Sequence, residues 1–313
     1  MTDSKPSPLT FLKGAAMGIA EVIPGVSGGT IAFVTGIYER LLAVIKAVLG
    51  PTVLRALREG GPAAAWRAAD GTFLATLLAG MAAGLVAGVF GITHLLHHYP
   101  PLVWAFFFGL IVASVFYVAG HVQRWRPLAG VWLLLGAATA FGVTVATPAQ
   151  GIEAPWFVFL SGTIAISALM LPGISGSFML LLMGMYAYVL GAVKGFLKGF
   201  DGASAVTVAT FAAGCLVGLA TFSRVLTWLF KRHHDATMAL MTGFMVGSLY
   251  KIWPWRKVLS TRINSKGEEV PFQEAAVWPA DYPGEPYLAG ALALAVAGFV
   301  LVRLLDRAGR RAG

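Results

Sequence analysis

A helix-breaking motif occurs twice inside long apolar stretches of this chain. The first copy spans residues 24–29 (PGVSGG), and the second spans residues 172–177 (PGISGS). Proline and glycine interrupt helices, and broken backbone is tolerated at membrane depth only where protein or a polar cavity surrounds it. Two related breaks in one chain are typical of transporters built from internal repeats.

The composition is that of a polytopic membrane protein. The chain is 58% hydrophobic and only 12% charged, and several windows of about 18 or more residues carry almost no charge, as in membrane-spanning helices. The net charge of +9 does not indicate a nucleic-acid partner, because the basic residues lie in short loops between apolar segments. His94, His97 and His98 have no Cys or carboxylate nearby in the sequence, so we expect no metal site and no cofactor.

The similarity between the two halves extends beyond the motif. At the spacing of the two breaks, the matching residues are Gly36, Tyr38 and Lys46 in the first half and Gly184, Tyr186 and Lys194 in the second. A second register downstream pairs Gly80, Gly84, Gly109 and Ser114 with Gly214, Gly218, Gly243 and Ser248. Gly-rich helix packing explains single glycine pairs but not the whole ordered series. Duplication therefore predicts two domains, 1–150 and 151–313.

We expect an all-α polytopic membrane protein made of two inverted repeats. In each half, two short apolar arms flank the break (9–23 and 29–49, then 156–171 and 177–195). Three fuller segments follow each pair, at 71–93, 101–120 and 130–147, then at 205–230, 236–252 and 287–305. The first arms are short for a hydrocarbon core of about 30 Å, so each pair predicts a re-entrant hairpin. Three crossings per half make the two hairpins enter from opposite faces.

The loop charges predict that both termini are cytoplasmic. The inner loops and tail would then contain Arg55, Arg58, Arg67, Arg124, Arg126, Lys231, Arg232, Arg307, Arg310 and Arg311. The outer loops 94–100 and 148–155 contain no Lys or Arg, in agreement with the positive-inside rule. Lys194 and Lys198 would lie outside and are the main exception.

The two breaks form the candidate anion-binding site. A helix that restarts after a break presents free N–H groups and the positive end of its dipole, which bind anions such as phosphate. Glycine allows close approach of a ligand, and hydroxyl groups add donors. The candidate residues are Pro24, Gly25, Ser27, Gly28, Gly29 and Thr30, with Pro172, Gly173, Ser175, Gly176 and Ser177. The alternative is a pair of kinks in which Ser and Thr satisfy freed backbone groups.

Three charged residues complete the candidate site. Glu21 lies in an apolar setting before the first break, and intramembrane carboxylates are functional by default. It could carry a coupling proton, pair with a basic residue, or serve as a structural partner for backbone amides. Arg40 and Arg224 are the candidate cations for a phosphate. Their alternatives are a local ion pair with Glu39 for Arg40 and snorkelling to the interface for Arg224.

Four sequence runs resemble one known family. They are Ala20–Thr30 (AEVIPGVSGGT), Gly36–Arg40 (GIYER), Leu171–Ser177 (LPGISGS) and Gly247–Trp255 (GSLYKIWPW). Together they resemble the bacterial polyprenyl-phosphate transporters of the PopT type. The resemblance implies movement of undecaprenyl phosphate, the lipid carrier of cell-wall precursors, from the outer to the inner leaflet of the cytoplasmic membrane. That family usually has Asp where this chain has Glu21, and often has Lys where Met185 stands.

The implied function suits the predicted site. A charged headgroup cannot cross hydrocarbon unaided, whereas an isoprenoid tail can stay in lipid, so a polar notch open sideways to the bilayer is sufficient. A proton on Glu21, Na⁺ or the membrane potential could drive net transport. A small-anion transporter is one alternative, and a lateral opening onto lipid would count against it.

The other alternative is an enzyme resembling the undecaprenyl-pyrophosphate phosphatases, which share a Pro-Gly-x-Ser loop. In that family an Arg follows the motif serine, whereas Gly28 and Gly176 stand at these positions here. The arm 156–171 also contains no carboxylate that could act as a general base. We therefore do not expect an enzyme.

Overall fold

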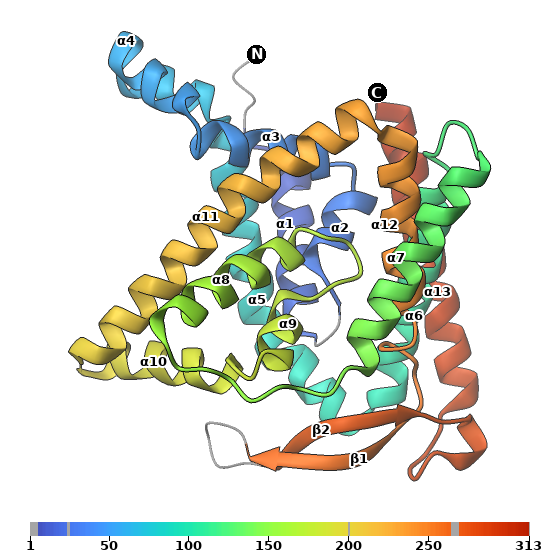
Figure 1. Cartoon of the computed structure of the whole chain (residues 1–313). Coiled ribbons are helices and arrows are strands. Elements are labelled where there is room, and N and C mark those ends of the chain that lie inside the picture. Colours follow the sequence, from blue (N-terminus) through green and yellow to red (C-terminus); the bar gives the residue numbers. More distant parts are fainter. Residues whose placement is uncertain (1–5, 24–25, 200, 264–268, 313) are drawn as a thin grey trace.

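The computed structural model describes residues 6–23, 26–199, 201–263 and 269–312 (Figure 1). Within these ranges, thirteen α-helices are accompanied by one two-stranded antiparallel sheet and a short 3₁₀ helix. The prediction of a helical, polytopic membrane protein is confirmed. The structure departs from the all-α prediction at one place, where residues 256–263 and 269–276 form the paired strands β1 and β2.

The helices of the two halves follow one another in a matching order. The first half contains α1 (Pro8–Val22), α2 (Gly28–Val34), α3 (Tyr38–Val48), α4 (Pro51–Ala68), α5 (Gly71–His98), α6 (Pro100–Ala119) and α7 (Pro127–Val145). The second half contains α8 (Pro155–Leu169), α9 (Gly176–Leu182), α10 (Tyr186–Gly199), α11 (Gly202–Arg232), α12 (His234–Ser248), β1 (Arg256–Ile263), β2 (Glu269–Ala276), η1 (Pro279–Asp281) and α13 (Leu288–Ala312). Five of these helices begin with proline in the first turn, where its missing N–H costs no hydrogen bond.

Five of the described helices are long and apolar enough to cross a membrane: α5, α6, α7, α11 and α13. The predicted segment 236–252 is shorter than expected, because α12 has only 15 residues and ends at Ser248. Most of α12 is buried among its neighbours. Helix α12 is therefore largely a core helix.

The predicted second arms, 29–49 and 177–195, are not continuous helices. The first divides into α2 and α3 and the second into α9 and α10, and α9 and α10 meet at an angle of 110°. The breaks lie at Gly36 and Gly184, whose φ angles are +71° and +69°. Such left-handed backbone ends a helix and strongly favours glycine. The matched pair of glycines thus marks a second break in each hairpin.

The hairpins reach the middle of the molecule from different sides. In Figure 1, α1 runs from the end that carries both termini toward the middle, and α2 returns from there. Helix α9 points from the middle toward the end that carries β1 and β2. The linker 51–70 forms α4, which projects at the end of the termini and is kinked at Gly61.

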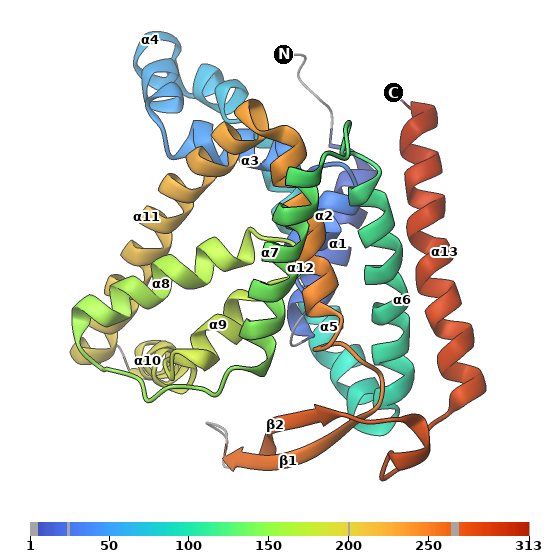
Figure 2. The ribbon, with the colours of Figure 1, turned by 45° about the vertical axis from the view of Figure 1, so that its right-hand side comes forward.

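Helix packing depends on glycine contacts. Helix α1 packs on α5, α8 on α11, α6 on α13 and α7 on α12, and Figure 2 shows the last two pairs side by side. A Cβ at Gly80 or Gly84 of α5 would collide with the carbonyls of Phe11 and Ala15. Small residues at such positions allow the close backbone approach on which helix association in membranes depends.

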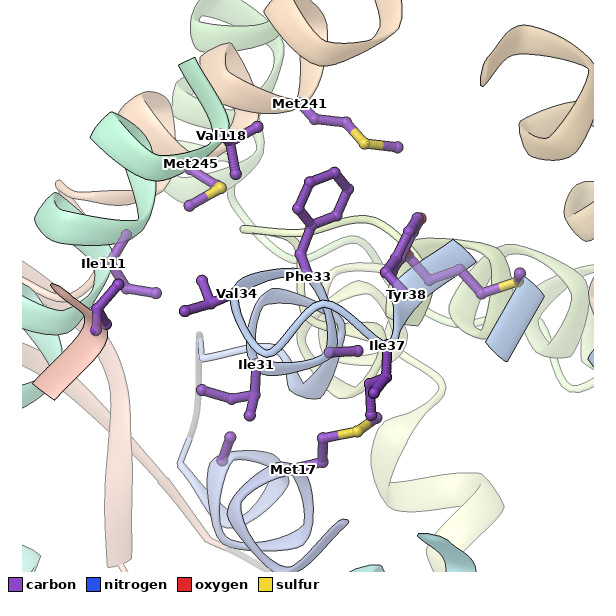
Figure 3. Close-up of a cluster of buried hydrophobic side chains, with 14 of the residues drawn as sticks. Met17, Ile31, Phe33, Val34, Ile37, Tyr38, Ile111, Val118, Met241 and Met245 are labelled. Carbon is purple, nitrogen blue, oxygen red and sulfur yellow. The ribbon is translucent and has the colours of Figure 1, made fainter. Parts of the chain in front are cut away.

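The first hairpin forms the centre of the main core. Every residue of α2 is buried. Phe33 and Tyr38 pack in one cluster with Met241 and Met245 of α12 and Val118 of α6 (Figure 3). The core therefore fixes the position of the first break relative to the helices of both halves.

Candidate functional site

The two helix breaks meet in the structure. The hydroxyl of Ser27 donates to the carbonyls of Leu169 and Leu171, each at 3.4 Å. The hydroxyl oxygen of Thr30 accepts a hydrogen bond from the Gly173 N–H at 3.0 Å. Polar groups of the first break therefore satisfy backbone groups that the second break leaves free.

Tyr38 adds a third contact between the hairpins, which the sequence did not indicate. Its hydroxyl donates to the carbonyl of Met170 at 2.6 Å, and the whole side chain is buried. The repeat pattern singled out Tyr38 and Tyr186 as a pair, but Tyr186 is only half-buried. No sequence motif indicates this contact, because the partner of Tyr38 is a backbone carbonyl next to the opposite break.

Glu21 occupies the start of α2. Its Oε1 accepts a hydrogen bond from the Gly28 N–H at 2.7 Å, and Ser27 accepts one from the Gly29 N–H at 3.1 Å. A Cβ at position 28 would lie 2.6 Å from the same Glu21 oxygen, so a glycine is needed for this approach. The amides expected to face an anion thus bind groups of the chain itself, Gly28 the Glu21 carboxylate and Gly29 the Ser27 hydroxyl. Pro24 and Gly25 lie outside the described residues.

The second break is the more accessible of the two. Ser175 and Ser177 place their hydroxyl oxygens 3.0 Å apart, and Ser175 also accepts a 3.5 Å hydrogen bond from Phe178 N–H. Pro172, Ser175 and Gly176 are buried, whereas Ser177 is exposed. In this conformation the Ser177 side chain is therefore accessible to a ligand, whereas Ser27, Thr30 and Ser175 are buried.

An apolar cavity leads to the first break. Its volume is about 390 Å³, and its walls come from α1, α3, α5, α11 and the tip of α8. Glu21 and Gly29 lie at its polar end, and Tyr38 is the only other residue with a polar side chain in the lining. Val48 and Leu78 also line the cavity and are exposed on the molecule's surface. The cavity therefore reaches the surface of the molecule between α3 and α5.

Arg40 and Arg224 hold α3 in place. Arg40 forms a 2.7 Å ion pair with Asp70, and its guanidinium lies 4.2 Å from the centre of the Phe73 ring. Arg224 donates to the carbonyls of Ala220 at 2.7 Å and Leu49 at 3.0 Å. The described contacts of both side chains tie α3 to α5 and α11, and the described ion pair of Arg40 is with Asp70.

Comparison with known proteins identifies the family. Residues 17–270 match the family described as VCA0040-like, undecaprenyl phosphate translocase-like. The chain belongs to this family. It is 44% identical over 299 residues to the polyprenyl-phosphate transporter of Vibrio cholerae serotype O1, covering 93% of this chain and 94% of the relative. It is 32% identical over 270 residues to the protein of the same name from Staphylococcus aureus, covering 79% of this chain and 86% of the relative. No solved structure matches the chain.

The region shared with the translocase-like family contains both breaks. It extends from Met17 in α1 to Val270 in β2, and so includes the tips of both hairpins and the helices that form most of the apolar cavity. The resemblance found in the sequence runs is thereby confirmed at the level of the family.

Proposed function

We propose that this protein transports undecaprenyl phosphate from the outer to the inner leaflet of the bacterial cytoplasmic membrane. One observation carries the proposal: two broken hairpins meet at a polar point next to an apolar cavity that reaches the surface beside α5, a helix long and apolar enough to cross a membrane. A phosphate needs hydrogen-bond donors, whereas a polyprenyl tail needs apolar walls, and the site offers both side by side. The names of the two relatives support the same substrate class.

The proposed transporter consists of two inverted repeats, 1–150 and 151–313. The helix pairing supports this division, because α1 packs on α5 as α8 packs on α11. In the other pairs, α6 packs on α13 and α7 packs on α12. If α6 corresponds to α12 and α7 to α13, a two-fold rotation exchanges these two pairs. Such a relation gives alternating access by movement of one repeat against the other.

The contacts at the tips define a closed arrangement in this proposal. Ser27, Thr30 and Tyr38 bind the backbone at residues 169–173, so a headgroup can pass only when these bonds separate. The phosphate would then bind the groups released on both hairpins. During this movement Arg40 would hold the first turn of α3 and Arg224 would hold its C-terminal end. Neither side chain would contact the phosphate directly.

Glu21 links the headgroup to a proton in this mechanism. A phosphate and an ionised carboxylate compete for the Gly28 N–H, and two anions repel each other at such short range. Protonation of Glu21 removes both obstacles, because a neutral carboxyl is a weaker acceptor and carries no charge. Uptake of one proton would therefore accompany each headgroup, which makes H⁺ the coupling ion favoured over Na⁺.

The test is leaflet-resolved transport in proteoliposomes. We expect the full-length protein to move undecaprenyl phosphate between leaflets and Ser177→Leu to lower the rate at least tenfold, because Ser177 is exposed at the second break. Thr221→Leu, on an exposed position of α11, is the matched control and should keep the wild-type rate. Wild-type liposomes that move the lipid no faster than empty ones would refute the proposal. Uptake of inorganic phosphate without lipid movement would point to a small-anion transporter.

A further inference from the structure

A second cavity lies at the end of the molecule that carries the β-hairpin. Its volume is about 240 Å³, and it is lined by α9, the end of α7 and the loop after it, the turn between α12 and β1, and both strands. The charged residues in its lining are Lys251, Arg256 and Glu274. None of them belongs to either helix break, and Glu274 reaches the other two only because β2 pairs with β1.

The cavity carries more positive than negative charge. Lys251 Nζ and Arg256 Nε lie 3.8 Å and 3.2 Å from the same oxygen of Glu274. The side chains of Lys251 and Arg256 are only 15% and 5% exposed. Burial lowers the pKa of Lys251, Arg256 lowers it further, and Glu274 opposes both effects. Two buried cations that share one carboxylate favour the arrival of an anion.

Arg256 is paired in charge but not fully in hydrogen bonding. Its Nη1 donates to the carbonyls of Tyr250 and Lys251, which fixes the guanidinium against the turn before β1. Its Nε is buried and forms the 3.2 Å ion pair with Glu274, but within the described part of the chain it makes no hydrogen bond of good geometry. A ligand oxygen that accepts from this N–H would therefore improve on the contact that Glu274 provides.

The cavity lies directly along the second hairpin. Phe178, Leu181 and Leu182 of α9 form one wall, and the Lys251 ammonium lies 4.8 Å from the centre of the Phe178 ring. Phe178 follows Ser177 at the exposed end of the second break. Helix α9 has seven residues, so about 10 Å separate its two ends. An anion held by Lys251 is therefore separated from the second break by no more than about the length of α9.

We infer that Lys251 and Arg256 form a capture site for a phosphomonoester headgroup on the face that carries β1 and β2. The headgroup moves from there along α9 to the second break. The apolar side chains of α9 contact the part of the lipid tail next to the headgroup. The inference rests on the proposed function, which supplies the lipid form of the ligand. Free phosphate shares the same headgroup chemistry, so the test includes both.

The test measures binding to the full-length protein in nanodiscs. The probes are radiolabelled undecaprenyl phosphate, undecaprenol as the uncharged analogue, and inorganic phosphate as a competitor. We expect Lys251→Met to weaken binding of undecaprenyl phosphate about tenfold, because the variant lacks the ammonium group that would donate hydrogen bonds to the phosphate. Lys251→Arg should restore it. Lys257→Met removes an exposed lysine of the adjacent strand and should leave binding unchanged.

Transport by the same variants separates this inference from the proposed function. If the wild-type protein transports the lipid and Lys251→Met binds and transports it as well as Lys257→Met does, the capture site is refuted and the function stands. If the wild-type protein transports no lipid but binds inorganic phosphate through Lys251, the function fails and the anion site stands. Equal affinity for undecaprenol and undecaprenyl phosphate would also refute the capture site, because the headgroup would then contribute nothing.

Discussion

Glu21 places a carboxylate where an anionic ligand would bind. Helix starts with free amides attract anions, and the sequence indicated such a start at Gly28. In the structure, the Glu21 carboxylate occupies this helix start, with its Oε1 2.7 Å from the Gly28 nitrogen. This leaves no room for a side chain at position 28. An internal anion of this kind keeps the amide satisfied in the absence of a ligand. Its release then becomes a step that a proton can control.

The first prediction concerns Glu21→Gln. Glutamine can still accept the hydrogen bond from Gly28 but can neither carry a negative charge nor take up a proton. We expect its transport rate to vary little from mildly acidic to mildly alkaline pH, whereas the wild-type rate rises as the pH falls. The measurement is lipid movement in proteoliposomes across that range. Glu153→Gln, in the exposed segment before α8, is the control and should keep the wild-type profile.

A wild-type pH profile in Glu21→Gln would assign Glu21 a structural role. In that case Na⁺ or the membrane potential would have to supply the driving force. The hydrogen bond to Gly28 would then serve only to satisfy the backbone at the start of α2.

At the scale of the helices, the sequence allowed prediction of the arms but not of their internal breaks. The first arms, 9–23 and 156–171, agree with α1 and α8 to within a few residues. Each second arm, 29–49 and 177–195, is predicted as one apolar arm with no internal break, although the repeat includes Gly36 and Gly184. A glycine inside an apolar run is compatible with a continuous membrane helix. Only the positive φ angles, which depend on tertiary packing, distinguish a break from a helical glycine.

The contact between the hairpins also lay beyond sequence patterns. Ser27 and Thr30 were predicted to face an anion, with satisfaction of freed backbone groups as the alternative. In this conformation they bind the backbone at Leu169, Leu171 and Gly173. Those partners are main-chain groups of the opposite half, and the side-chain sequence contains no information on their position. Proximity of the two breaks could be expected from the repeat, but the partners could not.

The second prediction belongs to the scale of the helices and tests the packing of α1 on α5. In Gly84→Ala, the new methyl group would collide with the carbonyl of Ala15, so α1 must move away. We expect a loss of about 1–3 kcal/mol in stability, as for other overpacked sites. The measurement is the thermal unfolding midpoint in detergent. Gly91→Ala lies on the same helix with nothing within 4 Å and should be neutral or slightly stabilising.

Equal midpoints for the two alanine variants would contradict this account of the packing. They would show that α1 adapts to the added methyl group without cost. The match between Gly80, Gly84 and their counterparts Gly214 and Gly218 would then have no basis in close helix contact.

The whole molecule has two different ends. The end with both termini also carries α4, whose exposed residues include Arg55 and Arg58. The opposite end carries β1 and β2. No sequence pattern connects Lys251 with Glu274, because the pairing of β1 with β2 brings them together. The capture site thus depends on the element that was absent from the predicted fold.

The last prediction concerns the orientation of these two ends in the membrane. In a Cys215→Ala background, Arg58→Cys places a thiol on the exposed surface of α4, and Asp281→Cys places one in η1 beside the β-hairpin. Since basic loops stay in the cytoplasm, a membrane-impermeant maleimide added to intact cells should label Asp281→Cys and spare Arg58→Cys. Permeabilised cells provide the control, because both variants should then react. Labelling of Arg58→Cys alone in intact cells would place Lys251 and Arg256 on the inner face, and those residues could then release a headgroup but not capture one from the outer leaflet.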